Sequence, residues 1–261
     1  MLSHPKLKVY GKVLAVVASL GNHSASWNKR HAVVAQLCRA SESTILNLAE
    51  GARLRRTAQK QQILACAVGS ALECAACLDI AVIKQFLLPE LATMEKRSLC
   101  EVVRMLVGLR RSWDDNALRE EPPAYAGKPE FEPQGGYFAH EPLEVYQVGL
   151  GFMRRFNGLA AGAELSDRLS RQVDKAATSV ILNIAEGYGR TGGGDRLRFL
   201  EIAETSAVRA AAYLDLCVSK EGLDTEQGPA GAELLGRVVL MLRALAGNRS
   251  VDSTSLRQSS R

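Results

Sequence analysis

The chain lacks the features that mark membrane, secreted and disordered proteins. Among its 261 residues no apolar run reaches the roughly 18 residues of a membrane-spanning helix. The first twenty residues contain lysines but no compact apolar core followed by a small-residue cleavage site, which excludes a typical signal peptide. An apolar share of 47% with a charged share of 23% excludes global disorder. We therefore expect a globular cytoplasmic protein with no membrane partner.

The residues that build metal and catalytic sites are also scarce. The histidines show no Glu-x-x-His spacing, which argues against a ferritin-like di-iron site. Cys74-x-x-Cys77 is a single pair, whereas a zinc site needs four closely spaced ligands. Cysteine in this setting is usually a small core residue. We predict no metal, no cofactor and no enzymatic activity.

The positive charge is concentrated in one half of the chain. The formal net charge is +5. Residues 1–125 contain 17 Lys and Arg against 11 Asp and Glu, a net of +6, while residues 126–261 have a net of −1. A basic half joined to a neutral half permits an acidic partner on the basic side.

The sequence contains the same unit twice. The string Asn-x-Ala-Glu-Gly occurs at 47–51 and at 183–187, and a shift of 136 positions aligns the two halves without a gap. We expect one domain at 1–112 and a second at 140–247. The segment 113–139 between them is rich in proline and glycine and has no apolar period, as in a linker. The tail 248–261 is predicted to be disordered.

Within each unit the apolar period is helical throughout. The first helix is expected to bury Leu7, Tyr10, Leu14 and Val17, which the second unit repeats at Leu143, Tyr146, Leu150 and Met153. No segment alternates with period two. Four helices with short connections predict an all-α fold of two tandem antiparallel up-and-down four-helix bundles.

Several glycines lie where the second helix of each unit ends. Gly51 and Gly187 are predicted to be left-handed C-terminal caps. Gly187-x-Gly189-x-x-Gly192 matches the dinucleotide-binding fingerprint as a bare pattern. That fingerprint needs a strand before it, and here a helix precedes it, so we interpret the pattern as a flexible turn.

Two longer strings carry a resemblance to a known family. They are Ser-Thr-Ile-Leu-Asn-Leu-Ala-Glu-Gly at 43–51 and Ser-Val-Ile-Leu-Asn-Ile-Ala-Glu-Gly at 179–187, each followed by a serine on the next helix, Ser70 or Ser206. Each unit resembles the small bacterial four-helix bundle family that includes proteins encoded in 23S rRNA intervening sequences and the accessory variability determinant of diversity-generating retroelements. The resemblance covers essentially the whole of each unit.

The resemblance implies several properties. Family members are four-helix bundles that assemble side by side into rings, typically pentameric, and have no established enzymatic activity. The retroelement member binds nucleic acid and a reverse transcriptase through a basic surface. This chain departs from the family because the unit is doubled, and because Thr205 and Arg209 replace Gly69 and Glu73 in the second copy. Two-unit chains cannot completely fill a five-membered ring.

The repeated motif provides the first group of candidate site residues. Each Asn–Glu pair is spaced by three on one helical face near a helix end, where the dipole disfavours a carboxylate without a partner. One hypothesis is a subunit contact or ligand-binding pair, and the other is an intramolecular bond that fixes the corner. No acid, His or nucleophile accompanies Glu50 at a spacing typical of general base catalysis. The motif residues are Asn47, Glu50, Gly51, Ser70, Glu73, Asn183, Glu186, Gly187 and Ser206.

Basic residues just past these corners form the second group. Clustered guanidinium groups suit several phosphates in salt-dependent contacts, and no aromatic stacking platform or base-reading motif accompanies them. We therefore expect a homo-oligomer that binds RNA or DNA without sequence preference, or a nucleic-acid enzyme. The alternative is a solvated polar face on a purely structural or adaptor protein. The candidates are Arg53, Arg55, Arg56 and Lys60, and Arg190, Arg196 and Arg198.

Overall fold

The protein is all-α, as predicted. The computed structural model describes residues 4–54, 56–113, 137–162, 165–190, 193–221, 223 and 226–258, and within these ranges it contains α-helices and one short 3-10 helix but no strand. Most of the linker predicted at 113–139 lies outside the described residues, as does Arg55.

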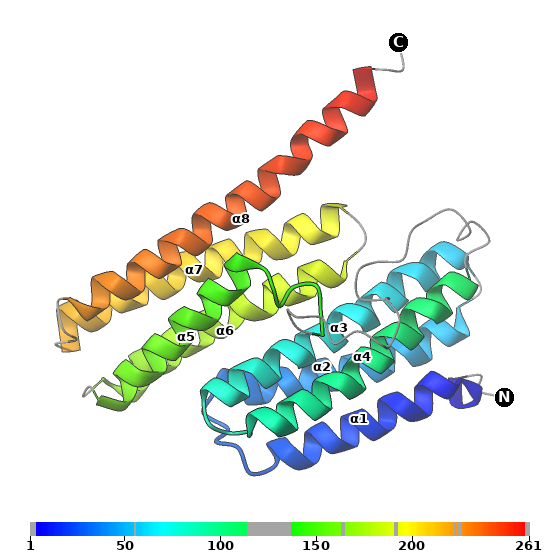
Figure 1. Cartoon of the computed structure of the whole chain (residues 1–261), viewed down its shortest axis with the longest axis horizontal. Helices are drawn as coiled ribbons and strands as arrows, with labels where there is room; N and C mark the ends of the chain where they lie inside the picture. Colours follow the sequence, from blue (N-terminus) through cyan, green and yellow to red (C-terminus); the bar gives the residue numbers. More distant parts are fainter. Residues whose placement is uncertain are drawn as a thin grey trace.

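The first four helices form one packed set. They are α1 (Lys8–Ser24), α2 (Ala32–Arg53), α3 (Thr57–Ile83) and α4 (Pro89–Ser112). Each helix packs against the next and α4 packs against α1, so the set closes on itself. Successive helices alternate in direction (Figure 1).

The last four helices repeat this arrangement. They are α5 (Glu144–Gly162), α6 (Asp167–Gly189), α7 (Gly193–Glu221) and α8 (Gln227–Gln258). Here too each helix packs against the next and α8 returns to α5 (Figure 1). The α8 helix continues to Gln258, past the boundary predicted at Gly247, and no glycine or proline in the sequence after Gly247 would stop it.

The most apolar helix is α3, which packs against helices of both sets. Its length and composition would allow it to cross a membrane, but most of it is buried inside the protein. Fifteen of its residues, spread around the helix, are buried. A helix that is apolar all round is typical of a position at the centre of a protein, and contacts on several sides explain its composition.

The buried face of α1 differs from the predicted one. Its buried residues are Val9, Val13, Val16 and Leu20. Leu7, Tyr10 and Val17 are only half-buried, and Leu14 is exposed. The predicted face lies next to the core, not in it. The equivalent residues Tyr146, Leu150 and Met153 of α5 are buried.

The glycines of the two repeated strings are not left-handed caps. Gly51 and Gly187 lie inside their helices, which continue to Arg53 and Gly189, and neither has a positive φ. A Cβ on Gly187 would lie 3.1 Å from the Cβ of Phe199 on the next helix. These glycines therefore serve close helix packing. The prediction of a flexible turn at Gly187 and Gly189 is also wrong, while Gly192 lies outside the described residues.

The main contact between the two sets joins helices that are not equivalent. The main contact is between α3 and α6, with smaller contacts between α2 and α6 and between α3 and α5. In the repeat, α6 corresponds to α2 and α5 corresponds to α1, because the offset is 136 residues. We call this contact the joint. It brings one face of the first set against a different face of the second.

Candidate functional site

Two glycines allow the helices of the joint to approach closely. A Cβ on Gly189 of α6 would lie 3.0 Å from the Cα of Gly69 on α3 and 2.7 Å from Cδ1 of Leu72. A Cβ on Gly69 would lie 3.2 Å from atoms of Glu186 and Arg190. A side chain at Gly189 would overlap Leu72 and come too close to the backbone of Gly69, so glycine at this position allows the close approach of α3 and α6.

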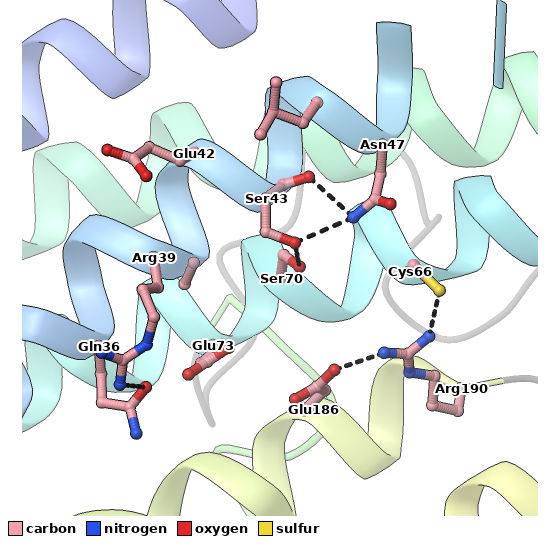
Figure 2. A pocket seen from close by; sticks show the side chains of 12 residues that line it. Gln36, Arg39, Glu42, Ser43, Asn47, Cys66, Ser70, Glu73, Glu186 and Arg190 are labelled. Atoms are coloured by element: carbon pink, nitrogen blue, oxygen red, sulfur yellow. Dashed lines mark hydrogen bonds and ion pairs between the residues drawn. The ribbon is translucent and has the colours of Figure 1, made fainter. Parts of the chain in front are cut away.

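An open cavity of about 600 Å³ lies where α2, α3 and α6 meet (Figure 2). At one end, Nη1 of Arg190 donates to Sγ of Cys66 at 2.8 Å, and the same guanidinium forms an ion pair with Glu186. At the other end, Nη2 of Arg39 donates to Oε1 of Gln36 at 2.7 Å. These two contacts hold Arg190 within the joint, and little of its side chain is exposed.

Two carboxyl groups face each other in this cavity, one from each unit (Figure 2). Burial raises the pKa of Glu73 to about 7, and the charge of Glu186 adds to the shift, while Arg39 and Arg190 oppose it. Near neutral pH the Glu73 carboxyl is therefore partly protonated. The arrangement contains no nucleophile with a base beside it, so it has the character of a packed contact and not of a catalytic pair.

The repeated asparagines form hydrogen bonds within the second helix of each unit, to a serine that in turn contacts the third helix. Nδ2 of Asn47 donates to the carbonyl oxygen of Ser43 at 2.8 Å and to its Oγ at 2.9 Å, and Oγ of Ser43 lies 2.8 Å from Oγ of Ser70. The second unit repeats all three contacts, through Asn183, Ser179 and Ser206. For the asparagines, the intramolecular hypothesis describes these contacts.

The glutamates of the motif differ between the copies. Glu186 pairs with Arg190, the C-cap residue of the same helix. Glu50 is exposed and, within the described residues, forms no ion pair, because Leu54 occupies the position equivalent to Arg190.

A second polar group of the joint surrounds Lys96 of α4. Nζ of Lys96 forms ion pairs with Asp79 of α3 and with Glu141, the latter at 2.7 Å. Oη of Tyr146 on α5 donates to Oδ2 of Asp79 at 2.8 Å. Burial lowers the pKa of Lys96, but the charges of the two carboxylates outweigh it and raise the pKa overall. This network joins both units.

A third polar contact crosses the joint at the far end of α3. Nζ of Lys84 lies 2.6 Å from Oδ1 of Asp174 on α6, and both side chains are almost fully buried. Oδ2 of Asp174 accepts from the backbone N–H of Ala32 at 3.0 Å. Burial raises the pKa of Asp174, yet its bonds with His31 and Lys84 produce a net lowering. The sequence did not predict this ion pair or the Lys96 group, because the residues of each group form no recognisable local pattern in the sequence.

The predicted basic cluster of the first unit lies at the corner between α2 and α3. Arg53 and Arg56 are exposed, and Nζ of Lys60 lies 4.6 Å from the centre of the Trp113 ring at the end of α4. The first turn of α3 contains no acidic residue, and its N-cap, Arg56, makes no side-chain cap. The last turn of α4 adds Arg110 and Arg111. We call Arg53, Arg56 and Lys60 the basic corner.

The matching cluster of the second unit is less available to a ligand. Arg190 is held in the joint, and the guanidinium of Arg196 lies 3.9 Å from the centre of the Tyr188 ring. Arg198 is exposed, but Asp195, in the first turn of α7, lies three residues before it on the same helix. The structure therefore leaves this corner with fewer exposed cations than the first.

The cysteines occur as free thiols within the described residues. Cys74 and Cys77 are fully buried, as expected of core residues, and burial raises the pKa of both thiols well above the ordinary value. Among the residues that the structure describes, no three His, Cys, Asp or Glu side chains come together in a way that could hold a metal ion.

Fold and site define a class of protein: an all-helical tandem repeat with a polar joint and an exposed basic corner. The family model described as 23S rRNA-intervening sequence protein matches residues 5–108 and again residues 141–244. The chain belongs to this family and contains its unit twice. Comparison with the curated proteins and with the solved structures gave no match.

Proposed function

We propose that this protein is a non-enzymatic, RNA-associated accessory factor of the cytoplasm. In this proposal the chain is a tandem pair of up-and-down four-helix bundles that forms a homo-oligomer and binds RNA or DNA without sequence preference. The basic corner supplies the contact, and a nucleic-acid enzyme is the kind of protein that such a factor would serve.

The observation that carries the proposal is the charge environment at the start of α3. Backbone N–H groups at a helix start attract anions, and here the first turn contains no acidic residue and the N-cap residue makes no side-chain cap. Arg53, Arg56 and Lys60 surround this helix start and add three positive charges. A phosphate backbone would satisfy all of these groups together.

The family description also supports an association with RNA. Its description refers to an intervening sequence of 23S rRNA, which is an association with RNA. The description names no reaction, and the cavity at the joint has no catalytic arrangement. A role in holding components together fits both observations.

The direct test is a binding titration of the full chain with a labelled RNA hairpin at low salt. We expect R53A/R56A/K60A to weaken binding about tenfold, because each ion pair formed at the protein surface contributes up to about 1 kcal/mol. A charge-matched control is R154A/R155A/K220A, which removes three exposed cations elsewhere in the second unit. Equal weakening by both triple variants would contradict the proposal.

A purely structural or adaptor role is the second candidate, and the exposed apolar side chains favour it. Leu46, Val208 and Leu240 are each more than half exposed, as expected of surfaces that meet other proteins. The same titration separates the two functions. No binding of RNA or DNA at low salt would favour the adaptor.

A further inference from the structure

The cavity where α2, α3 and α6 meet contains a carboxyl group without a partner. Among the described residues Glu73 accepts no hydrogen bond and forms no ion pair, although its side chain is half-buried (Figure 2). Arg190 is occupied by the joint, because its Nη atoms donate to Cys66 and Glu186 and its Nε is buried beside Gly69. A carboxylate that loses water without gaining a donor is destabilised, so the cavity lacks a donor at Glu73.

The inner part of the cavity also lacks one positive charge. Arg39 and Glu42 line the cavity where both are exposed, and their charges balance. Of the other charged residues in the lining, Glu73 and Glu186 are acidic and Arg190 is basic. Two ionised carboxylates with one guanidinium leave one negative charge without compensation. In a partly desolvated site such a charge attracts a cation more strongly than it would in water.

Apolar side chains line the same cavity. Leu46 of α2 is 66% exposed there, and Ala40 lies on the same helix. An alkyl chain in the cavity would remove the Leu46 side chain from water while a charged end remained free to meet the carboxylates. The volume of about 600 Å³ is within the range of sites for small molecules. The lining therefore suits a molecule with an apolar part and a cationic end.

The repeat does not supply this arrangement a second time. In the second unit Arg209 occupies the position equivalent to Glu73, so the carboxyl group is replaced by a cation. The position equivalent to Glu186 is Glu50 of the first unit, which is exposed and does not line the cavity. The pair of carboxyl groups depends on the packing of α6 against α3 at the joint. We therefore expect one site in each chain.

We propose that this cavity binds a small organic cation, an ammonium or guanidinium group on an alkyl chain. The cationic group lies between Glu73 and Glu186 and donates to both carboxylates, while the alkyl chain packs on Leu46. A metal ion suits the site less well, because among the described residues no three His, Cys, Asp or Glu side chains come together to hold one. The site shares no residue with the basic corner, so it goes beyond the proposed function and does not rest on it.

Binding of the cation competes with protonation of Glu73. The pKa of Glu73 is about 7, and a cation beside the carboxylate favours its ionised form. Between pH 6 and pH 8 the ionised fraction of Glu73 rises about tenfold, so the affinity for the cation should rise about tenfold as well. The charged and titratable groups around Glu73 are Arg39 and Glu42 of α2, Cys66, Cys74 and Cys77 of α3, and Glu186 and Arg190 of α6.

The test is isothermal titration calorimetry of the full chain with agmatine, an alkyl chain that ends in a guanidinium and an ammonium group. At pH 8 we expect one agmatine per chain. E73Q should weaken binding at least about tenfold, because it removes a charged acceptor. R39Q should strengthen binding, because Arg39 lines the cavity and repels the ligand. E50Q removes an exposed carboxylate outside the cavity and is the matched control, with wild-type affinity expected.

Several results would overturn the proposal. The wild-type chain could bind no agmatine up to about 10 mM, or bind it equally at pH 6 and pH 8. E73Q could keep wild-type affinity, R39Q could bring no gain, or uncharged 1,4-butanediol could bind as well as agmatine. The pH dependence of the wild-type chain and the gain in R39Q test the site without altering the half-buried carboxyl group. Failure of the basic corner to bind RNA would leave all of these results unchanged.

Discussion

At the scale of single residues, the asparagine of each repeated motif has the most clearly defined structural role. Asn47 donates to both the carbonyl and the hydroxyl of Ser43, and that hydroxyl meets Ser70 on the next helix. The side chain therefore links helix geometry to helix packing. Because Asn183 does the same in the second unit, the motif has a structural purpose in both copies.

Replacing Asn47 should destabilise the first unit. We expect N47A to lower the free energy of unfolding by about 1–2 kcal/mol, because two hydrogen bonds near the buried contact are lost. N47D keeps the volume but cannot donate, so it should cost at least as much. Urea unfolding measures both. A loss under about 0.5 kcal/mol for both variants would contradict this role.

Glu73 makes stability depend on pH. Its pKa rises from 4.5 to about 7 in the folded protein, so the folded state binds the proton more tightly than the unfolded chain. Its contribution is thus most favourable below pH 4.5 and is lost as the pH rises to about 7. We expect E73Q to raise the melting temperature at pH 8 and to change it little at pH 5. An equal change at both pH values would be contrary to this account, and exposed E50Q serves as the control.

The sequence predicted which residues recur in the motif but not what they contact. The repeated string located Asn47 and Glu186, whereas Glu73 has no counterpart in the second copy, where Arg209 replaces it. The partners of Lys96 are 17 and 45 residues away in sequence, and no local spacing links them. Contacts between distant segments depend on the docking of helices, which no single helix encodes.

At the scale of helices, the distance between α3 and α6 depends on glycine. We expect G189A to destabilise the protein by about 1–3 kcal/mol, because the new methyl group would overlap Leu72 and the backbone of Gly69. G151A is the matched control, since a Cβ there meets nothing within 4 Å, and it should be neutral or stabilising. The measurement is the melting temperature of both variants. Equal melting temperatures would show that the helices separate without cost.

Lys96 ties three segments together at the other side of the joint. We expect K96M to cost about 3–5 kcal/mol, because the buried carboxylate of Glu141 and the half-buried carboxylate of Asp79 would lose the cation that pairs with them. K12M removes a lysine from an exposed pair with Glu101 and is the control, with an expected cost of at most about 1 kcal/mol. Similar costs for the two variants would argue against a structural role of the buried group.

Helix positions followed from the sequence, while the buried face of α1 did not. The positions of apolar residues along a helix depend on every surface that the helix contacts. Tyr10 and Leu14 repeat Tyr146 and Leu150, which are buried in α5, so they have the character of core residues although Tyr10 is only half-buried and Leu14 is exposed. The apparent error reflects a contact that α5 makes and α1 does not make within one chain.

At the scale of the whole molecule, the repeat predicted two units but not how they meet. Sequence identity between copies is symmetric, whereas the joint pairs unlike faces. Substitutions such as Glu73 to Arg209 distinguish an inner face from an outer one, but only after the structure shows which face is inside. The uneven net charge between the halves was visible from composition alone.

The central claim is that the basic corner binds a phosphate backbone. The most direct measurement is the salt dependence of RNA affinity for the full chain and for R53A/R56A/K60A. If three phosphate contacts are lost, the slope of log K against log salt should become shallower by about two for a single strand. An unchanged slope, or wild-type binding that does not respond to salt, would contradict the account.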